Sequence, residues 1–559
     1  MTTFHPSRRH VLAGSALAAV AASAGCSFDK GDGSGGSDGG GGGKSSINLN
    51  SFGPKPTFVN NFNPFSPADG VVGSNYLYET LMYEDVNAEY EIKPWLAEKL
   101  DFNPEQRTAS ITLRDDATWS DGTKITADDV VYTVVDLPKQ AEEQKANATA
   151  QEFTAKKVDD LTVEFEWPED KFDVDGDRAI ARLRIYPKHI FSTENLAKFT
   201  NTEPVTSTPL TLKEFTPQRV SFTVREDHFM GPWEHIKEVN WTPFGSAEIG
   251  KSMILQGTLD WATLSLQNAD ETIVAQGNHY WTVELVGSEG IIFNTAKAPF
   301  DDKHVRNAIY AALDTDQIHS LFDIGLKSTS PTTMDEKIYG EKVAEEYRAP
   351  HTADPEAAKK YLADGGWTVE GGKLAKDGKT YDISFKTVAD YVNWATWSDG
   401  VKAQLKDVLG LDVKILKVPD AQIWAQYAKG EFDFGMTWIG GGPRISAVYA
   451  DFHSKNFLPL GEEAPGNAAR VKNPELDALL DESREEFDET KLNELGYQMQ
   501  KIVVEECYCG PFNPSASFIE ASGKNWEGFP GMPLKKGDII PRPYGPEGWL
   551  TMQKLKPVK

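Results

Sequence analysis

Hydrophobic and polar residues follow two different periods between residues 380 and 443. Short apolar-rich runs predict strands over residues 381–388, 411–418 and 432–439. Between these runs the apolar residues recur every three or four positions, which predicts two helices. The first helix ends at Gly410, and the second runs from an Asp420 cap to Gly430. This alternating order predicts a parallel sheet with connections of one hand.

The same periods predict elements on either side of this segment. Alternation over residues 109–113 predicts a half-buried strand, and Thr126 with Asp129 three positions later predicts the start of a helix. Later helices each begin after a capping side chain, and proline occupies the first helical position in two of them. These starts are Asp302, Asp354-Pro355 and Asn473-Pro474.

Side chains suited to ligand binding follow two of the predicted strands. In open α/β sheets the ligand crevice lies beyond the carboxyl ends of the strands. Indole rings offer a broad apolar face and one N–H donor, which suits a sugar ring. The candidates are Tyr391, Asn393, Trp394, Trp397 and Asp399 after the first strand, and Trp438, Gly440, Gly441 and Gly442 after the third. The alternative is that Trp394 and Trp438 fill the core and that Asp399 only caps a helix.

Length and charge limit the class of protein. The chain has 559 residues, 40% of them hydrophobic, which is enough for two or more cores because single cores seldom exceed about 250–300 residues. Its formal net charge is −27. Nucleic acids and anionic membrane surfaces attract clustered Lys and Arg, so the acidic balance argues against both as partners.

The N-terminus predicts export from the cytoplasm. Residues 7–12 resemble a twin-arginine motif, and the apolar run over residues 11–22 is too short for a membrane span, so residues 1–25 are predicted to be a signal peptide. Cys26 ends a lipobox-like sequence, which favours a lipoprotein anchored to the cell membrane. Residues 26–46, rich in Gly and Ser, would then be a flexible tether. The alternative is cleavage after residues 22–24 and a freely secreted protein.

Two further motifs bear on metals and redox chemistry. The acids of residues 173–177 are spaced like a calcium loop, but Lys171 and Arg182 occupy the first and twelfth ligand positions, so an EF-hand is excluded and only a looser ion site stays open. Cys507 and Cys509 are too close for an ordinary bridge, which predicts two buried thiols or a strained local disulfide. No metal site, cofactor or catalytic residue is predicted.

The amino-acid sequences of several segments resemble those of a known protein family. Residues 94–132, PWLAEKLDFNPEQRTASITLRDDATWSDGTKITADDVVY, and residues 290–314 resemble the family 5 extracytoplasmic solute-binding proteins of ABC importers. The resemblance covers about residues 47–559. It implies an α/β, periplasmic-binding-protein-like fold with two lobes, three domains and a ligand cleft between the lobes. The implied parts are lobe I (47–74, 204–299 and 534–559), an inserted domain II (75–203) and lobe II, which is domain III (300–533).

The same resemblance implies a function. The protein would be a monomer that performs no chemistry, closes its lobes on a ligand and delivers that ligand to the membrane permease of an ABC importer. A secreted glycoside hydrolase is the competing class, and it would need two carboxylates about 5–5.5 Å or about 6.5–9.5 Å apart at the sugar.

The ligand class is inferred from the run that follows Trp438. Peptide-binding members carry an aspartate soon after this tryptophan, whereas residues 438–443 are WIGGGP and resemble members that import oligosaccharides. Residues 260–262 resemble the element that gives sugar binders another stacking ring, here Trp261, and Asn61 and Asn63 match a loop that borders the cleft. A β-linked gluco- or xylo-oligosaccharide is expected. An oligopeptide is the alternative, ahead of nickel chelates, opines and siderophores.

Overall fold

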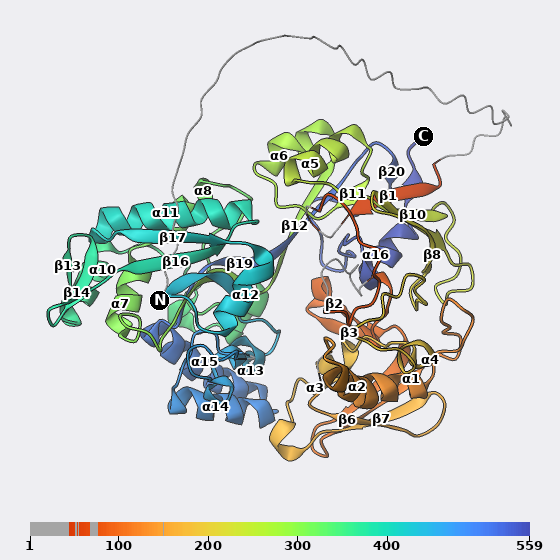
Figure 1. Ribbon diagram of the computed structural model, residues 1–559, viewed down its shortest axis with the longest axis horizontal. Helices are drawn as coiled ribbons and strands as arrows, with labels where there is room; N and C mark the ends of the chain where they lie inside the picture. Colours follow the sequence, from red (N-terminus) through yellow and green to blue (C-terminus); the bar gives the residue numbers. More distant parts are fainter. Residues whose placement is uncertain (1–43, 51–52, 54, 68–75, 149, 465) are drawn as a thin grey trace, which may run out of the picture. The chain divides into compact units, whose positions relative to one another are not determined.

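A computed structural model describes residues 44–50, 53, 55–67, 76–148, 150–464 and 466–559 (Figure 1). The predicted signal peptide, Cys26 and most of the predicted tether lie outside these residues. The last residues of the predicted tether belong to the folded chain: Lys44 Nζ lies 2.9 Å from Asp260 Oδ2, and the first strand, β1 (Ser46–Asn50), already includes Ser46. No helix in the described part of the chain has both the length and the apolar character of a membrane span.

One ten-stranded sheet runs through most of the described chain. Its central strands are β12 (His279–Phe293) and β19 (Cys509–Ala521), which pair antiparallel along nearly their whole length with register shifts after Glu284 and after Glu289. On one side of this pair the order is β18 (Phe434–Ile439), β16 (Ile383–Val388) and β17 (Val413–Val418). On the other side it is β11 (Trp261–Ala262), β1, β10 (Glu238–Trp241), β9 (Arg219–Val224) and β8 (Leu210–Thr216).

Two large hydrophobic cores give the two lobes. The first core extends from Ile47 through residues of the predicted inserted domain to Leu555, and the second lies between Ile291 and Phe518. The long strands contribute to both cores: Trp281 of β12 belongs to the first and Phe293 of the same strand to the second. The fold is therefore the expected two-lobed α/β arrangement, with β12 and β19 continuous between the lobes.

The inserted domain shares the core of lobe I. Its four-stranded antiparallel sheet has the order β4 (Ala97–Asn103), β5 (Thr108–Leu113), β7 (Thr162–Glu166), β6 (Thr154–Lys157). The short helices α1 (Ala127–Val131), α2 (Leu137–Gln144) and α3 (Gly176–Ala181) gather with this sheet (Figure 1). Because one continuous core spans residues on both sides of positions 75 and 204, the exact domain limits stay a proposal.

The predicted alternation between residues 380 and 443 is confirmed. Strands β16, β17 and β18 are connected by α11 (Val392–Leu409) and α12 (Asp420–Ala428), and β16 pairs parallel with both neighbours. Helix α11 lies along β16 and β17 (Figure 1). Its apolar stripe includes the buried residues Val401, Leu405 and Leu409, and the helix ends at Gly410, which has a left-handed φ of 74°.

The predicted helix starts are also confirmed, with two differences of detail. Thr126 and Asp129 form a capping box, and the side chains of Asp302, Asp354 and Asn473 cap α7 (Lys303–Ala311), α10 (Pro355–Asp364) and α14 (Pro474–Glu485). Helix α11, however, begins at Val392, so Asp399 lies well inside the helix and does not cap it. Asp420 is the first residue of α12 and follows Pro419, which occupies the cap position.

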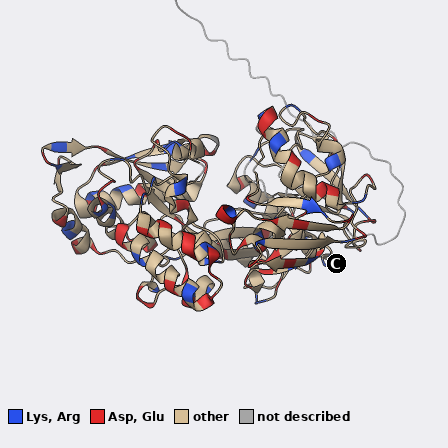
Figure 2. Ribbon diagram, turned by 90° about the horizontal axis from the view of Figure 1, so that it is seen from below, with Lys and Arg blue, Asp and Glu red and all other residues tan. Residues whose placement is uncertain are grey.

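Charged residues of both signs are distributed along the described chain. In the view of Figure 2, acidic and basic residues are interspersed along the helices.

Cys507 and Cys509 are buried free thiols, which confirms one of the two predicted alternatives.

Candidate ligand site at the ends of β16 and β18

Four aromatic rings meet where β16 and β18 end. Tyr391 and Trp394 come from the start of α11, Trp424 from α12 and Trp438 from β18. The ring centre of Trp438 lies 4.9 Å from that of Trp394, 5.2 Å from that of Trp424 and 5.8 Å from that of Tyr391. The rings meet here because parallel neighbours β16 and β18 end at the same sheet edge and the following helices start there. We call these four residues the aromatic cluster.

Trp438 is the member of the cluster with an open surface. It keeps 47% of its surface exposed, although the other five residues of β18 are buried. Trp424 stacks on it at an interplanar angle of 23°. An exposed indole at the end of a buried strand is a platform on which an apolar ligand face can pack.

A buried carboxylate lies next to this platform. Glu289 of β12 pairs with Trp438 across β18 and with Asn513 across β19. Its Oε2 accepts a hydrogen bond of 2.8 Å from Trp394 Nε1, and the residue keeps only 6% of its surface exposed. Within the described residues, Glu289 forms no ion pair with a basic side chain. Burial raises the pKa of Glu289, and hydrogen bonds from Trp394, Asn513 and Trp438 oppose that rise.

Asn513 is held in place from the side of lobe II. His319 Nε2 lies 3.1 Å from Asn513 Oδ1, and the Asn513 amide nitrogen donates to Pro514 O at 2.9 Å. Burial lowers the pKa of His319 to about 4, so the ring is neutral at neutral pH. Since the amide oxygen can only accept, the neutral ring carries its proton on Nε2 and donates it. This chain of contacts fixes the polar group beside Glu289.

One further carboxylate orients two of the aromatic rings. Asp420 Oδ1 accepts hydrogen bonds of 2.9 Å from the Tyr391 hydroxyl and from Trp424 Nε1. The start of α12 is thereby tied to the start of α11. The polar edges of both rings are satisfied by the protein, which leaves their faces to define the shape of the site.

The glycine run after Trp438 packs against β12. Gly440 has a φ of +65°, and a Cβ there would lie 2.6 Å from Val448 O. The Tyr339 hydroxyl accepts from Gly287 N at 3.2 Å and donates to Gly442 O at 3.0 Å. Gly441 is exposed, with nothing within 4 Å of a Cβ placed on it. The run thus follows the strand that carries Glu289, with Gly441 as its open position.

The remaining predicted residues of α11 lie outside the open surface. Trp397 is buried and donates from Nε1 to Phe322 O at 3.3 Å, and Asn393 is buried on the same helix. Asp399 is exposed, and its carboxylate lies 3.1 Å from Lys417 Nζ of β17. The structure therefore brings Trp394 and Trp438 together but places Asp399 in a surface ion pair.

The predicted residues of lobe I have different surroundings. Trp261 is fully buried, donates from Nε1 to Pro541 O at 2.8 Å and packs its ring 5.2 Å from that of Phe529. The Asn63 amide donates to Leu196 O and Phe199 O and accepts from Phe65 N. Asn61 accepts from Asn63 N and donates to Ser66 Oγ. All three side chains are used in internal packing or hydrogen bonds, and their ligand contacts stay predictions.

Glu289, Asn513 and Trp424 were not among the predicted site residues. A signal existed for Glu289, because it is the one acid in residues 287–293, which are otherwise small or apolar. Its position beside Trp438 depends on the register of three strands far apart in sequence, which the pattern of one strand cannot supply.

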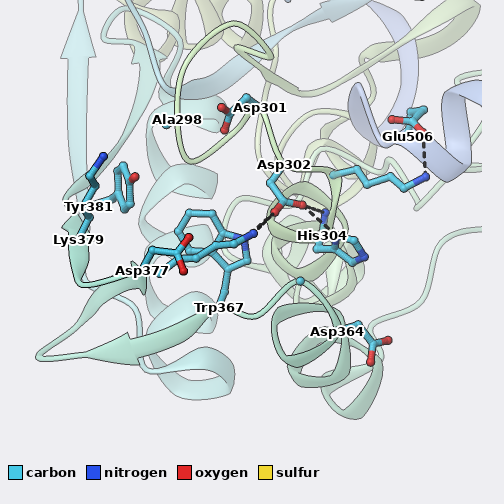
Figure 3. Close-up of a pocket in the computed structure, with 13 residues that line it drawn as sticks. Ala298, Asp301, Asp302, His304, Asp364, Trp367, Asp377, Lys379, Tyr381 and Glu506 are labelled. Atoms are coloured by element: carbon cyan, nitrogen blue, oxygen red, sulfur yellow. Dashed lines mark hydrogen bonds and ion pairs between the residues drawn. The ribbon is translucent and has the colours of Figure 1, made fainter.

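A cavity of about 670 Å³ lies away from the aromatic cluster, between α7, α10 and the hairpin of β14 (Lys373–Lys376) and β15 (Lys379–Tyr381) (Figure 3). Asp302 lies at its centre and accepts from Trp367 Nε1 at 2.8 Å, from Lys376 Nζ at 3.0 Å and from His304. Burial alone would raise the pKa of Asp302, but these hydrogen bonds hold it well below its usual value. Because Asp302 is also the cap of α7, its contacts are those of a structural network.

The calcium-like loop holds its acids against arginines. Asp173 and Asp175 lie 3.1 Å and 2.8 Å from Arg484 and Arg444. The described residues contain no group of three or more His, Cys, Asp or Glu side chains arranged to hold a metal ion.

Comparison with known proteins gives consistent matches. A family model described as bacterial extracellular solute-binding proteins, family 5 Middle, matches residues 91–457. Oligopeptide-binding protein AppA of Bacillus subtilis is 24% identical over 499 residues, covering 85% of this chain and 87% of that protein. Protein XP55 of Streptomyces lividans is 26% identical over 460 residues, covering 78% of each.

Solved structures share the fold. A periplasmic oligopeptide-binding protein of Thermotoga maritima with bound mannohexaose superimposes with a TM-score of 0.76 at 21% identity, covering 92% of this chain and 98% of that chain. AppA of Bacillus subtilis in complex with a nonapeptide gives 0.72 at 21% identity, covering 92% and 99%.

Proposed function

This chain belongs to the bacterial extracellular solute-binding proteins of family 5, and from that premise we propose that it captures an oligosaccharide for an ABC importer. Solute binding outside the cytoplasm, with a membrane permease as partner, is the function of the family. The proposed ligand is a β-linked gluco- or xylo-oligosaccharide, held while the two lobes close on it.

The exposed face of Trp438 is the observation that carries this proposal. A pyranose ring presents C–H groups on its faces and hydroxyl groups around its edge. The indole suits such a face, and Glu289 beside it suits the edge, because an ionised carboxylate accepts hydrogen bonds and hydroxyl groups donate them. Gly440 and Gly441 are proposed to line the same site, whereas a ligand contact of the buried Asn393 stays a prediction.

The sequence after Trp438 supports a neutral ligand. Residues 439–443 are Ile-Gly-Gly-Gly-Pro, so this loop offers no carboxylate to a ligand ammonium group. Burying an ammonium group without a counter-charge is costly. A protein of the same fold has been crystallised with mannohexaose.

An oligopeptide is the second candidate, and Glu289 is the observation that favours it. Its buried carboxylate has no basic partner among the described residues, and it lies where a ligand ammonium group would gain a counter-charge. AppA, a relative at 24% identity, is named as an oligopeptide-binding protein.

A ligand screen separates the two candidates. Residues 44–559 are mixed with cello-, xylo- and malto-oligosaccharides and with tri- to hexapeptides, and thermal stability and tryptophan emission are recorded. A ligand at a hundredfold excess over its Kd adds about 2.7 kcal/mol of stability. Stabilisation by a sugar together with changed emission supports the proposal, and stabilisation by peptides alone contradicts it.

We further propose that the ligand leaves chemically unchanged. A glycoside hydrolase would release shorter sugars, so prolonged incubation with each oligosaccharide followed by chromatography should yield no new product. A product that disappears on mutation of one carboxylate would instead establish an enzyme.

Lipid anchoring through Cys26 is proposed for the mature protein. In a cell that exports the chain, the native protein should remain with the membrane fraction, whereas Cys26→Ala should be released to the medium. Release of both proteins alike would favour the secreted form.

A further inference from the structure

The segment Lys171–Asp177, which we call the clasp loop, connects the inserted domain to lobe II through its main chain. Val174 N donates to Arg484 O at 2.9 Å, and Arg444 Nη1 donates to Val174 O at 3.0 Å. Val174 itself is fully buried. Arg444 directly precedes α13 (Ile445–Val448), and Arg484 lies in α14. Both main-chain polar groups of one inserted-domain residue are therefore satisfied by the opposite lobe.

Two arginines of lobe II also neutralise the acids of the clasp loop. Arg444 Nε lies 2.8 Å from Asp175 Oδ1, and its Nη2 lies 3.9 Å from Asp177 Oδ2. Arg484 Nε lies 3.1 Å from Asp173 Oδ2, and its Nη2 lies 3.5 Å from Glu152 Oε2. Asp175 and Arg484 are largely buried, so solvent and salt screen these contacts less than surface pairs.

Separation of the lobes would leave like charges close together. Asp173, Asp175 and Asp177 would lose both lobe II arginines, and Asp175 would keep only Arg178, whose Nε lies 3.7 Å away. Burial raises the pKa of Asp175 to about 6 even with Arg444 in place. A contact between aromatic rings supplements the charges. The ring centre of Phe172 lies 6.4 Å from that of Phe487, which lies just after the end of α14. The clasp loop is thus complementary to lobe II in charge and hydrogen bonding.

The clasp is connected through the chain to the candidate ligand site. Arg444 follows Trp438 by six residues, through the glycine run that Tyr339 fastens to β12. A ligand packed on Trp438 and an ion pair at Arg444 therefore act on the two ends of one short segment.

We infer that the clasp loop with Arg444 and Arg484 holds the two lobes together, and that these residues set ligand affinity without touching the ligand. The inference rests on the proposed function, since it assumes that ligand is held between the lobes. Affinity then depends on the fraction of molecules with the clasp closed, because a ligand that needs the closed form binds more weakly as that fraction falls.

The test compares the double variant Arg444→Gln/Arg484→Gln with a matched control, Arg114→Gln/Arg219→Gln. The control removes two arginine pairs, with Asp116 and with Glu214, that lie away from the clasp. Small-angle scattering without ligand should give a larger radius of gyration for the clasp variant than for the native protein or the control. Titration with whichever probe stabilised the native protein, a cello- or xylo-oligosaccharide or a tri- to hexapeptide, should show about tenfold weaker binding.

A charge exchange distinguishes a clasp from general damage. Asp173→Arg should weaken binding, and combining it with Arg484→Asp should restore at least part of the loss. An increase in the radius of gyration, or a loss of affinity with rescue, supports the clasp. Native affinity and native radius of gyration in the double variant would overturn it. If no ligand is found, the proposed function fails while the scattering comparison alone still decides the clasp.

Discussion

The aromatic cluster and the surroundings of Trp261 carry similar sequence signals but differ in the structure. Both contain a tryptophan at or near a strand of the large sheet, with an acid nearby. Trp438 keeps half of its surface open, whereas Trp261 is covered and donates to Pro541 O, 280 residues further along the chain. The difference teaches that a strand-end tryptophan becomes a binding surface only where no distant segment covers it.

Removing Trp261 should have the largest effect, and the effect should be on folding. Trp261→Ala deletes a fully buried ring and its hydrogen bond, which should lower the free energy of unfolding by about 3–5 kcal/mol. Denaturant unfolding measures this loss. If the variant instead keeps native stability and loses ligand affinity, Trp261 contacts the ligand as the family resemblance implied.

Removing Trp438 should weaken ligand binding more than it lowers the stability of the protein. Trp438→Ala deletes a half-exposed ring, so ligand affinity should fall by about 2 kcal/mol, a factor of about 30, from the lost apolar contact. Stability without ligand should change less than in Trp261→Ala. Isothermal titration and thermal unfolding of the two variants, measured side by side, test the comparison. Equal losses of ligand affinity in both variants would contradict the proposed difference between Trp438 and Trp261.

Replacing Glu289 with a neutral residue should show which class of ligand the site binds. Glu289→Gln keeps the size of the side chain but removes its charge, and an oligosaccharide should lose about 1.5 kcal/mol of binding free energy, typical of a hydrogen bond to a charged group. A much larger loss confined to peptides would assign the carboxylate to a ligand ammonium group. Unchanged binding of every ligand would assign Glu289 to packing alone.

A buried acid of the lobe I core gives a stability effect that depends on pH. Burial raises the pKa of Glu79 to about 8, against the opposing influence of the Trp95 and Trp549 side chains and the charge of Arg184. The folded state then holds this proton more tightly than the unfolded state, so stability falls as pH rises from about 4.5 to about 8. The slope should be about 1.4 kcal/mol per pH unit. Glu79→Gln should remove that slope in denaturant titrations at pH 6 and 7.

The smallest effect is expected at Asp399. Its carboxylate lies in an exposed pair with Lys417, and such pairs contribute about 0–1 kcal/mol. Asp399→Asn should change both stability and ligand affinity by less than about 0.5 kcal/mol. A marked loss of ligand affinity with unchanged stability would instead indicate that Asp399 contacts the ligand.

Much of the fold could be predicted from local patterns. The parallel order of β16, β17 and β18, the caps at Thr126, Asp302 and Asn473 and the left-handed stop at Gly410 all depend on neighbouring residues. Local rules suffice there because turn geometry and capping hydrogen bonds are made within a few residues.

The site could be predicted only in part, because its polar half depends on long-range register. The position of Trp438 followed from the strand end, but Glu289 reaches it through pairing of β12 with β18, and Asn513 through pairing with β19. The exposure of Trp438 and the burial of Trp394, a few ångströms apart, depend on which segment covers each ring. Neither the pairing of these strands nor the exposure of the two rings can be predicted from the local pattern of hydrophobic residues.

Fluorine NMR of protein labelled with 5-fluorotryptophan tests the central claim most directly. The chain has 14 tryptophans, and Trp438→Phe and Trp261→Phe assign the two resonances that matter. On addition of the ligand found in the screen, the Trp438 resonance should shift strongly and the Trp261 resonance should stay nearly fixed. A large shift at Trp261 with an unmoved Trp438 would contradict the assignment of the ligand site to the ends of β16 and β18.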